Sequence, residues 1–235
     1  MYRAILPNLF TVGNLFCGFL ALHYVILGNY RPAAWLIVLG AVLDKMDGKL
    51  ARAFGKDSQF GIQFDSLTDV CTFGIVPAVM IYNKHLHSGW GLAITFLFVL
   101  CGALRLARFN SMNLNDEKGD FYLGLPIPAA AVCLTQYVLF TDRAWESAHA
   151  AALAVPMVFF LCFLMISRLD YDSMPNFRGT AFADRFKQAF FILSIGFVIH
   201  PATQDFFFLT VMGFTLSGVY RWAVNVFRDE VTQHA

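Results

Sequence analysis

Stretches of about 20 mostly apolar residues recur along the whole chain, and this recurrence constrains the fold more than any other feature of the sequence. An α-helix of that length crosses the hydrocarbon core of a bilayer, where every backbone amide needs a partner within the protein. The recurrence therefore predicts membrane-spanning helices. We expect about eight, over residues 5–27, 33–54, 60–83, 90–111, 124–141, 148–168, 187–199 and 203–227.

The composition agrees with an all-α, polytopic membrane helix bundle. Of the 235 residues, 58% are hydrophobic and only 14% are charged, whereas a soluble domain has about 25% charged residues. Short connections and the lack of a linker predict a single integral membrane domain over residues 1–235. The formal net charge is +1 and no basic tract is present, so we expect no nucleic-acid partner.

Lys and Arg are shared unequally between the two sets of predicted loops. With the N-terminus inside, the outside loops hold only Arg31, Lys84 and Arg143. Loops on the cytoplasmic side carry an excess of Lys and Arg. The pattern therefore predicts both termini in the cytoplasm, and we expect a prokaryotic cytoplasmic (inner) membrane. If the short 187–199 segment fails to span, the C-terminus lies on the other side. The inside set includes Arg3, Arg52, Lys56, Arg108, Lys118, Arg168, Arg178, Arg185, Lys187 and Arg228.

Four aspartates lie at membrane depth in the second and third predicted spans. A carboxylate there costs roughly 2.5–3.5 kcal/mol to insert, so such residues are functional candidates. Asp44 and Asp47 are three apart, and Asp65 and Asp69 are four apart, so each pair lines one face of its helix. If the two helices are antiparallel neighbours, the faces can meet around one cavity. Carboxylates without His or Cys favour a hard divalent cation, Mg²⁺ or Mn²⁺.

Other interpretations of these aspartates stay open. They could form structural ion pairs with neighbouring Lys and Arg, or line a divalent-cation transport pathway. Small residues on the same faces leave room for a flat ligand such as a base, which a transporter does not need, and no inverted repeat is evident. Arg52 at the mouth could bind phosphate. The small residues are Gly48, Ala51 and Gly61.

The spacing from Asp44 to Asp69 reads D-x2-D-G-x2-A-R-x8-G-x3-D-x3-D. It resembles the signature of the CDP-alcohol phosphatidyltransferase family, and each position of that pattern is matched. The resemblance implies an integral membrane enzyme, usually a homodimer, built around a core of six helices. Such an enzyme transfers a phosphatidyl group from a CDP-linked lipid to an alcohol and releases CMP.

Four further stretches are similar to one branch of that family, the membrane-type (class II) phosphatidylserine synthases. They are residues 6–18, 104–110, 124–131 and 166–177. This similarity implies CDP-diacylglycerol as the donor and L-serine as the acceptor. A sibling enzyme that uses glycerol phosphate, inositol phosphate or choline is the alternative within the family.

The resemblance also implies roles for individual residues. Two divalent ions are held by Asp44, Asp47, Asp65 and Asp69, with Asp69 as the base that accepts the proton of the serine hydroxyl. Contacts to the CDP-lipid are implied for Asn8, Thr11, Gly48, Ala51, Arg52, Ser58 and Gly61.

The carboxylate of zwitterionic serine needs a cationic partner, ideally a bidentate arginine. Arg105 and Arg108 are three apart on one face of the fourth predicted span, and we expect one of them to bind this carboxylate. Asn110 could orient the acceptor. Arginines near a helix end also extend to lipid headgroups, which is the ordinary explanation for such a pair.

Overall fold

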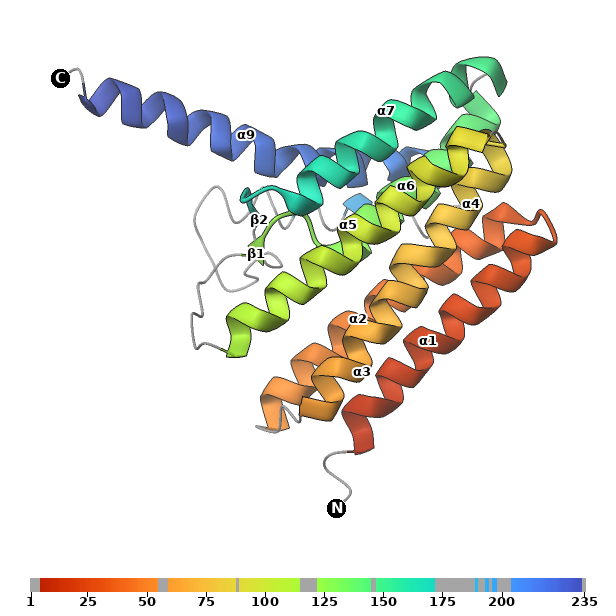
Figure 1. Ribbon diagram of the computed structural model, residues 1–235, viewed down its shortest axis with the longest axis horizontal. Coiled ribbons are helices and arrows are strands. Elements are labelled where there is room, and N and C mark those ends of the chain that lie inside the picture. The colour runs from red at the N-terminus through yellow and green to blue at the C-terminus, as the bar shows by residue number, and fades with distance from the viewer. Residues whose placement is uncertain are drawn as a thin grey trace.

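The chain forms an α-helical bundle in the computed structural model (Figure 1). The structure describes residues 5–54, 59–87, 89–114, 122–144, 147–171, 189, 193–194, 196–197 and 204–233. Its α-helices are α1 (Ile5–Ile26), α2 (Tyr30–Phe54), α3 (Gln59–Asp69), α4 (Val76–His85), α5 (Gly89–Leu114), α6 (Ile127–Ala144), α7 (Ser147–Ile166) and α9 (Phe207–Gln233). A π-helical segment, η2 (Val70–Ile75), joins α3 to α4, and a 3-10 turn, η3 (Gln204–Phe206), precedes α9.

A glycine turn reverses the chain between α1 and α2. Gly28 has a φ of 74°, a left-handed conformation that a residue with a Cβ rarely adopts. Its N–H donates to the Val25 carbonyl at 3.0 Å, and the Asn29 N–H donates to the Tyr24 carbonyl at 2.9 Å. This pair of bonds is the Schellman ending of a helix, which satisfies the last carbonyls of α1. The connection between the first two predicted spans is therefore a turn at residues 27–29, and α2 begins at Tyr30, three residues before the predicted start at residue 33.

The third helix is continuous from α3 through α4 but widens in the middle. Pro77 lies at the start of α4 and has no N–H to donate to the helix ladder. Just before it, the Val76 N–H donates to the Cys71 carbonyl, five residues back, as in a π-helix. The wider turn lets the proline ring fit inside a long helix. It begins at the residue after Asp69.

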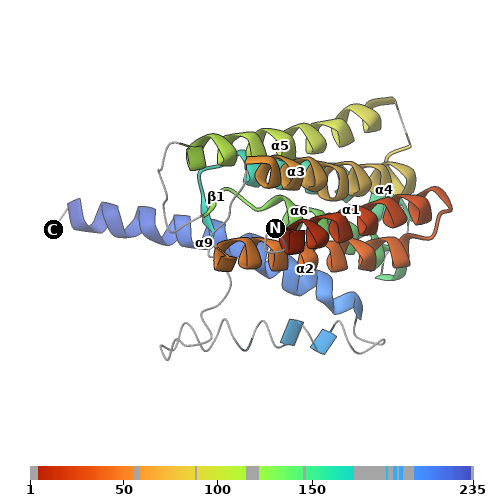
Figure 2. The same cartoon turned by 90° about the horizontal axis from the view of Figure 1, so that it is seen from below.

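The helices pack as neighbouring layers. Figure 2 shows α3 and α4 between α5 and α1, in agreement with the contacts of α4 to both α1 and α5. On the other side of α1 lies α2, which in turn packs on α6. Helix α6 also contacts α4, α7 and α9, so its middle part is buried on all sides. The core includes the fully buried Ile37, Phe73, Phe98, Leu134 and Leu161.

One short antiparallel strand pair ties α6 and α7 to α9. Tyr122 of β1 (Tyr122–Leu123) pairs with Tyr171 of β2 (Asp170–Tyr171). The Tyr171 hydroxyl donates to the Thr215 carbonyl of α9 at 2.9 Å. Its ring lies over Gly218, where an added Cβ would be only 2.4 Å from the ring. The pair is too small to alter the all-α class.

The predicted membrane bundle is confirmed in its helices. The helices observed for the first six predicted spans begin and end within three residues of the predicted bounds, while η3 and α9 together cover 204–233 where 203–227 was predicted. Within the described residues, five helices are long and apolar enough to cross a membrane by length and composition: Asn8–Ile26, Gln59–His85, Gly89–Ser111, His149–Ile166 and Phe207–Val224. Large apolar side chains such as Phe19, Phe163 and Trp90 are exposed, as lipid-facing residues are.

Two helices predicted as spans, α2 and α6, are not among those five. In α2 the reason is chemical, since its second half holds the charges of the 44–52 segment. Helix α6 is only 18 residues long, and its last turn holds the charged residues Asp142 and Arg143. Both pack inside the bundle, so neighbouring helices replace part of the lipid around them. The predicted span over 187–199 lies mostly outside the described residues.

Candidate metal centre and its surroundings

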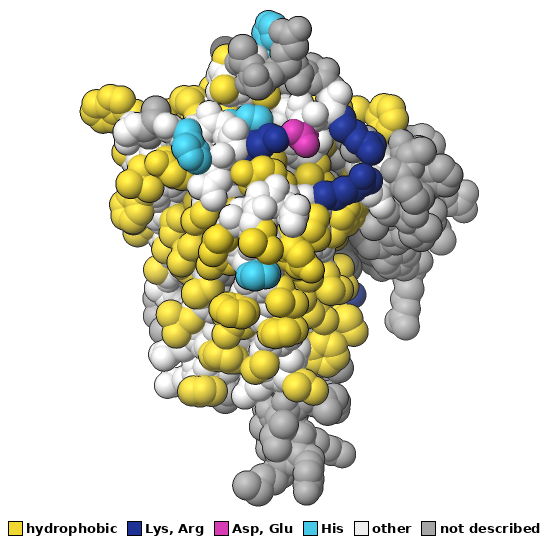
Figure 3. Space-filling model, turned by 90° about the vertical axis from the view of Figure 1, so that its right-hand side faces the viewer, with side chains coloured by type: hydrophobic (Ala, Val, Ile, Leu, Met, Phe, Trp, Pro, Cys, Tyr) yellow, Lys and Arg dark blue, Asp and Glu magenta, His cyan; other side chains and the backbone are white. Residues whose placement is uncertain are grey.

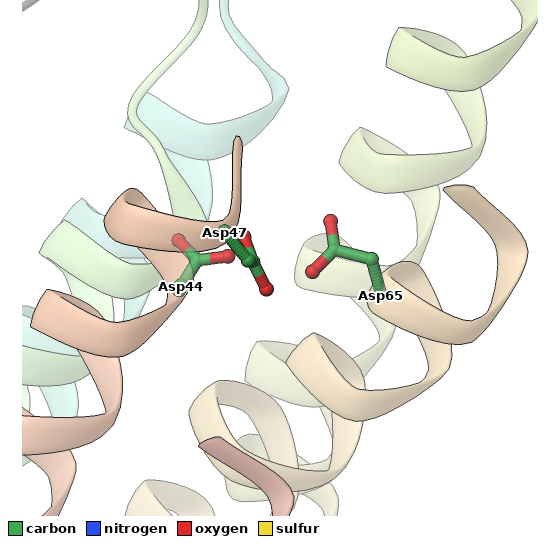
Figure 4. A group of neighbouring side chains, drawn as sticks. All are labelled: Asp44, Asp47 and Asp65. Atoms are coloured by element: carbon green, nitrogen blue, oxygen red, sulfur yellow. The ribbon is translucent and has the colours of Figure 1, made fainter. Parts of the chain in front are cut away.

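Three of the four aspartates converge between α2 and α3 (Figure 4). Asp44 and Asp47 come from α2 and Asp65 from α3, and each offers a carboxylate oxygen within 4.8 Å of the other two. Close backbone packing joins both α2 and α3 to α1 rather than to each other, so side chains occupy the space between them. The predicted meeting of the two carboxylate faces is confirmed for these three residues.

The carboxylate group is a strong candidate for cation binding on electrostatic grounds. At an effective dielectric constant of about 20, two unit charges 4.8 Å apart repel by roughly 3.5 kcal/mol. Asp47 is buried, and Asp44 and Asp65 are half-buried, so water screens the charges little. Within the described part of the chain, Oδ1 of Asp65 is buried without a hydrogen-bond partner. An oxygen-only donor set of this kind fits a hard divalent cation.

Asp69 lies deeper than the other three aspartates. Its side chain is 5% exposed and lies close enough to Asp44 for the two charges to act on each other, but it does not belong to the group of three converging oxygens. Asn14 of α1 donates from Nδ2 to Oδ1 of Asp69 at 3.3 Å. The role of Asp69 as a fourth ligand therefore stays a prediction, which its buried position beside Asp44 supports.

Helix α1 supplies hydrogen bonds to the aspartates at two levels. Thr11 donates from Oγ1 to Oδ2 of Asp47 at 2.9 Å, one helical turn before Asn14 reaches Asp69. Asn14 is fully buried, and a Cβ at Gly40 of α2 would lie 2.9 Å from its Oδ1, so the glycine makes room for it. The sequence predicted Thr11 as a contact to the CDP-lipid. In the structure its hydroxyl donates to the Asp47 carboxylate, and the contact of Thr11 with the lipid stays a prediction.

The predicted CDP-lipid contacts that the structure describes lie on the same helices as the aspartates and Thr11. Asn8 lies on α1 one turn before Thr11 and is half-buried. Gly48 is exposed, and a Cβ there would meet nothing within 4 Å, so open space adjoins Asp47. Gly61 lies one turn before Asp65 on α3. The side chains of Ala51 and Arg52 at the end of α2 are outside the described part of the chain, as is the whole of Ser58.

Arg105 and Arg108 of α5 interact with different parts of the bundle. Arg105 is 6% exposed, and its positive charge acts on the carboxylate of Asp44. Arg108 turns the other way and donates to the last carbonyls of α7, at 2.9 Å to Ile166 and 3.2 Å to Ser167. Arg108 thus caps a helix C-terminus, whereas Arg105 lies close enough to Asp44 for its charge to act on that carboxylate. The sequence placed Arg105 and Arg108 on one helix face, and that position alone could not tell their two roles apart.

Asn110 links α5 to α3 beside the aspartates. Its Nδ2 donates to Oγ of Ser66 at 2.8 Å, and the Ser66 hydroxyl donates in turn to the Ile62 carbonyl at 3.0 Å. Ser66 directly follows Asp65. Sequence reasoning missed Ser66 and the π-helical turn after Asp69. The proline eight residues after Asp69 was the available signal for the turn.

Comparison with known proteins gives one family. A family model described as CDP-alcohol phosphatidyltransferase matches residues 4–163. A Helicobacter pylori protein named CDP-diacylglycerol–serine O-phosphatidyltransferase is 35% identical over 225 residues, covering 92% of this chain and 90% of its own length. A Methanocaldococcus jannaschii protein of the same name is 37% identical over 71% of this chain and 73% of its own length. The archaetidylserine synthase of Methanothermobacter thermautotrophicus is 36% identical over 71% of this chain and 69% of its own length.

Proposed function

Because the chain belongs to the CDP-alcohol phosphatidyltransferase family, we propose that it is a membrane transferase that moves the phosphatidyl group of CDP-diacylglycerol to L-serine and releases CMP. The bacterial and archaeal relatives described above carry names of serine-using synthases, which supports serine over glycerol phosphate, inositol phosphate or choline. None of them is named as a cation transporter. The observation that carries the proposal is the convergence of Asp44, Asp47 and Asp65 next to the buried Asp69.

We propose that these carboxylates hold two divalent ions, Mg²⁺ or Mn²⁺. The converging oxygens and the unpartnered Oδ1 of Asp65 fit such ions. When bound, the ions neutralise the pyrophosphate of the donor and the charge that develops on the departing CMP. Open space next to Gly48 supports entry of the nucleotide on this side of Asp47. Asn8, Ala51, Arg52, Ser58 and Gly61 stay proposed contacts of the CDP-lipid.

Asp69 is the proposed base. The oxygen of the serine hydroxyl forms a bond to the β-phosphorus while the bond from that phosphorus to the bridging oxygen breaks. CMP leaves with the electron pair, and the hydroxyl proton passes to the Asp69 carboxylate. The Asn14 amide, which donates to Oδ1, orients this carboxylate so that its second oxygen is the one available to the acceptor.

Arg105 is the proposed partner of the serine carboxylate. It is buried on α5 and close enough to Asp44 for its charge to act there, so a serine bound beside it would sit between a cation and the reacting centre. Arg108 is already engaged with the carbonyls at the end of α7. Asn110 and Ser66 bond to each other, Ser66 directly follows Asp65, and both are proposed to contact the serine ammonium or hydroxyl through their side-chain oxygens.

We also propose a homodimer in a prokaryotic inner membrane, with the aspartates toward the cytoplasm. The excess of Lys and Arg in the loops at the aspartate end supports this orientation. Single cysteines at Lys49→Cys and Arg143→Cys, in a chain whose native cysteines are replaced, test it. A membrane-impermeant thiol reagent applied to intact cells should label only the second. Labelling of the first alone would reverse the orientation.

One experiment tests the reaction itself. The purified protein receives CDP-diacylglycerol with Mn²⁺ or Mg²⁺ and, separately, serine, glycerol 3-phosphate or inositol phosphate, and CMP release is measured. Release with serine alone supports the proposal, and release with another acceptor alone makes the chain a sibling enzyme. No release with any acceptor would reject the transferase. Asp65→Asn should be inactive, while Asp229→Asn, in the far part of α9, is the matched control for loss of one carboxylate.

A further inference from the structure

Helix α1 and the π-helical segment η2 are joined by a hydrogen bond close to Asp69. Thr72, the third residue of η2, is fully buried, and its Oγ1 donates to the backbone carbonyl of Asn14 at 3.3 Å. Asn14 is also the residue whose side-chain amide donates to Asp69. Its backbone and its side chain are therefore both bonded to one stretch of helix. Because Asp69 and Thr72 are only three residues apart, the two bonds close a small ring.

Two glycines leave the room that this ring needs. A Cβ at Gly18 of α1 would lie 3.1 Å from the Cα of Thr72 and still closer to its Oγ1, so a side chain there would force α1 away from η2. A Cβ at Gly40 of α2 would lie 2.9 Å from Oδ1 of Asn14 and 3.3 Å from Cγ2 of Thr72. Small residues of this kind let membrane helices approach closely. Helices α1 and α2 and segment η2 are thus packed tightly around Asn14 and Thr72.

The Asn14 amide is held at one end. An ionised carboxylate only accepts hydrogen bonds, so the amide turns its Nδ2 toward Asp69. This leaves Oδ1 buried and, within the described part of the chain, without a hydrogen-bond partner. The bond to Asp69 is also long, at 3.3 Å. The position of the amide therefore depends on where the α1 backbone lies at residue 14, and Thr72 contacts that backbone.

Water does not reach this contact to replace it. The outer surface of the bundle shown in Figure 3 is largely apolar, as a lipid-facing surface is. The side chains of Asn14 and Thr72 are each 0% exposed. Loss of the Thr72 hydroxyl therefore removes a contact between α1 and η2 that solvent cannot restore.

We propose that Thr72 is a positioning residue for Asp69, which acts through Asn14 and touches neither substrate nor metal. Its hydroxyl fixes α1 at Asn14, and the Asn14 amide then holds Oδ1 of Asp69 and leaves the second oxygen for the acceptor. This inference rests on the proposed role of Asp69 as the base. A carboxylate held in one orientation supports a faster reaction, because fewer of its conformations are unproductive.

The test measures kcat, the KM of both substrates and the metal requirement for CMP release in purified full-length variants. Thr72→Val keeps the shape and removes the hydroxyl. We expect kcat to fall about 3- to 10-fold, the effect of one neutral hydrogen bond, while both KM values and the metal requirement change less than about twofold. Thr72→Ser keeps the hydroxyl and should recover most of the kcat. Thr95→Val should leave kcat unchanged. It is the matched control, because Thr95 is a buried threonine of α5 whose hydroxyl, among the described residues, bonds to carbonyls of its own helix.

A double-mutant cycle tests the route through Asn14. Asn14→Ala alone should lower kcat by about 10- to 100-fold, because it removes a hydrogen bond to a charged group. In that background Thr72→Val should lower kcat by less than about twofold further, since the amide that it positions is gone. A double variant whose loss equals the product of the two single losses would contradict the route.

The outcomes separate this inference from the proposed function. A wild type that releases no CMP with any acceptor rejects the function and the inference together. With an active wild type, an unchanged kcat in Thr72→Val, an equal fall in the Thr95→Val control, or no recovery in Thr72→Ser overturns the positioning role alone. If Thr72→Val does not fold, Thr72→Ala gives the same comparison, because it removes the same hydroxyl with a smaller side chain.

Discussion

The contact between Thr11 and Asp47 offers the sharpest test of how the metal centre is built. The Thr11 hydroxyl donates to Asp47 Oδ2 at 2.9 Å, and both side chains are buried, with exposed fractions of 4% and 6%. Thr11→Val removes the donor and keeps the shape. A hydrogen bond to a charged group contributes about 1.5–3 kcal/mol, which corresponds to roughly 10- to 100-fold in an equilibrium constant. Supporting contacts of metal ligands are typically worth a similar factor in metal affinity.

We therefore expect Thr11→Val to raise the Mn²⁺ concentration for half-maximal CMP release about 10- to 100-fold. With saturating metal, the KM for CDP-diacylglycerol should change little. Thr11→Ser, which keeps the hydroxyl, should behave nearly as the wild type. Thr135→Val is the matched control, because Thr135 is a buried threonine whose hydroxyl, among the described residues, bonds to backbone carbonyls of its own helix.

The opposite pattern would refute this reasoning. If Thr11→Val raises the KM for the CDP-lipid and leaves the metal requirement unchanged, Thr11 contacts the substrate and not chiefly Asp47. If the Thr135→Val control shifts the metal requirement as strongly, the effect reports a general loss of packing. The assay needs only metal titrations at fixed substrate and substrate titrations at fixed metal, so the two explanations separate in one preparation.

Three further predictions concern the reaction and the α5 arginines. Asp69→Asn should lower kcat by about 10²- to 10⁴-fold yet keep CDP-lipid binding, and loss of binding would make Asp69 chiefly a ligand. Arg105→Lys should raise the KM for serine far more than that for CDP-diacylglycerol, and equal changes would remove the carboxylate assignment. Arg108→Gln should lower Tm by several degrees with little change in either KM, because it removes a helix cap worth about 1–3 kcal/mol. A normal Tm in that variant would contradict the capping role.

Much of the fold could be predicted because its signals are local. The apolar stretches that give α1, α3–α4, α5 and α7 are read from about 20 consecutive residues, and the turn at Gly28 from a glycine at a helix end. The π-helical segment was missed because an α-helical pattern continues through it. Only the proline at position 77, combined with the packing around it, forces the wider turn.

Helical periodicity is a property of neighbouring residues, so it is enough to predict a helical membrane bundle and to place Asp44, Asp47 and Asp65 on two helix faces. Which residues of other helices contact these faces follows only from the tertiary structure. Thr11 reaches Asp47 across 36 residues, and Arg108 reaches the end of α7 across 58, while the charge of Arg105 on the same helix acts on Asp44. Such contacts depend on how each helix is rotated against the next, and packing of the whole bundle sets that rotation.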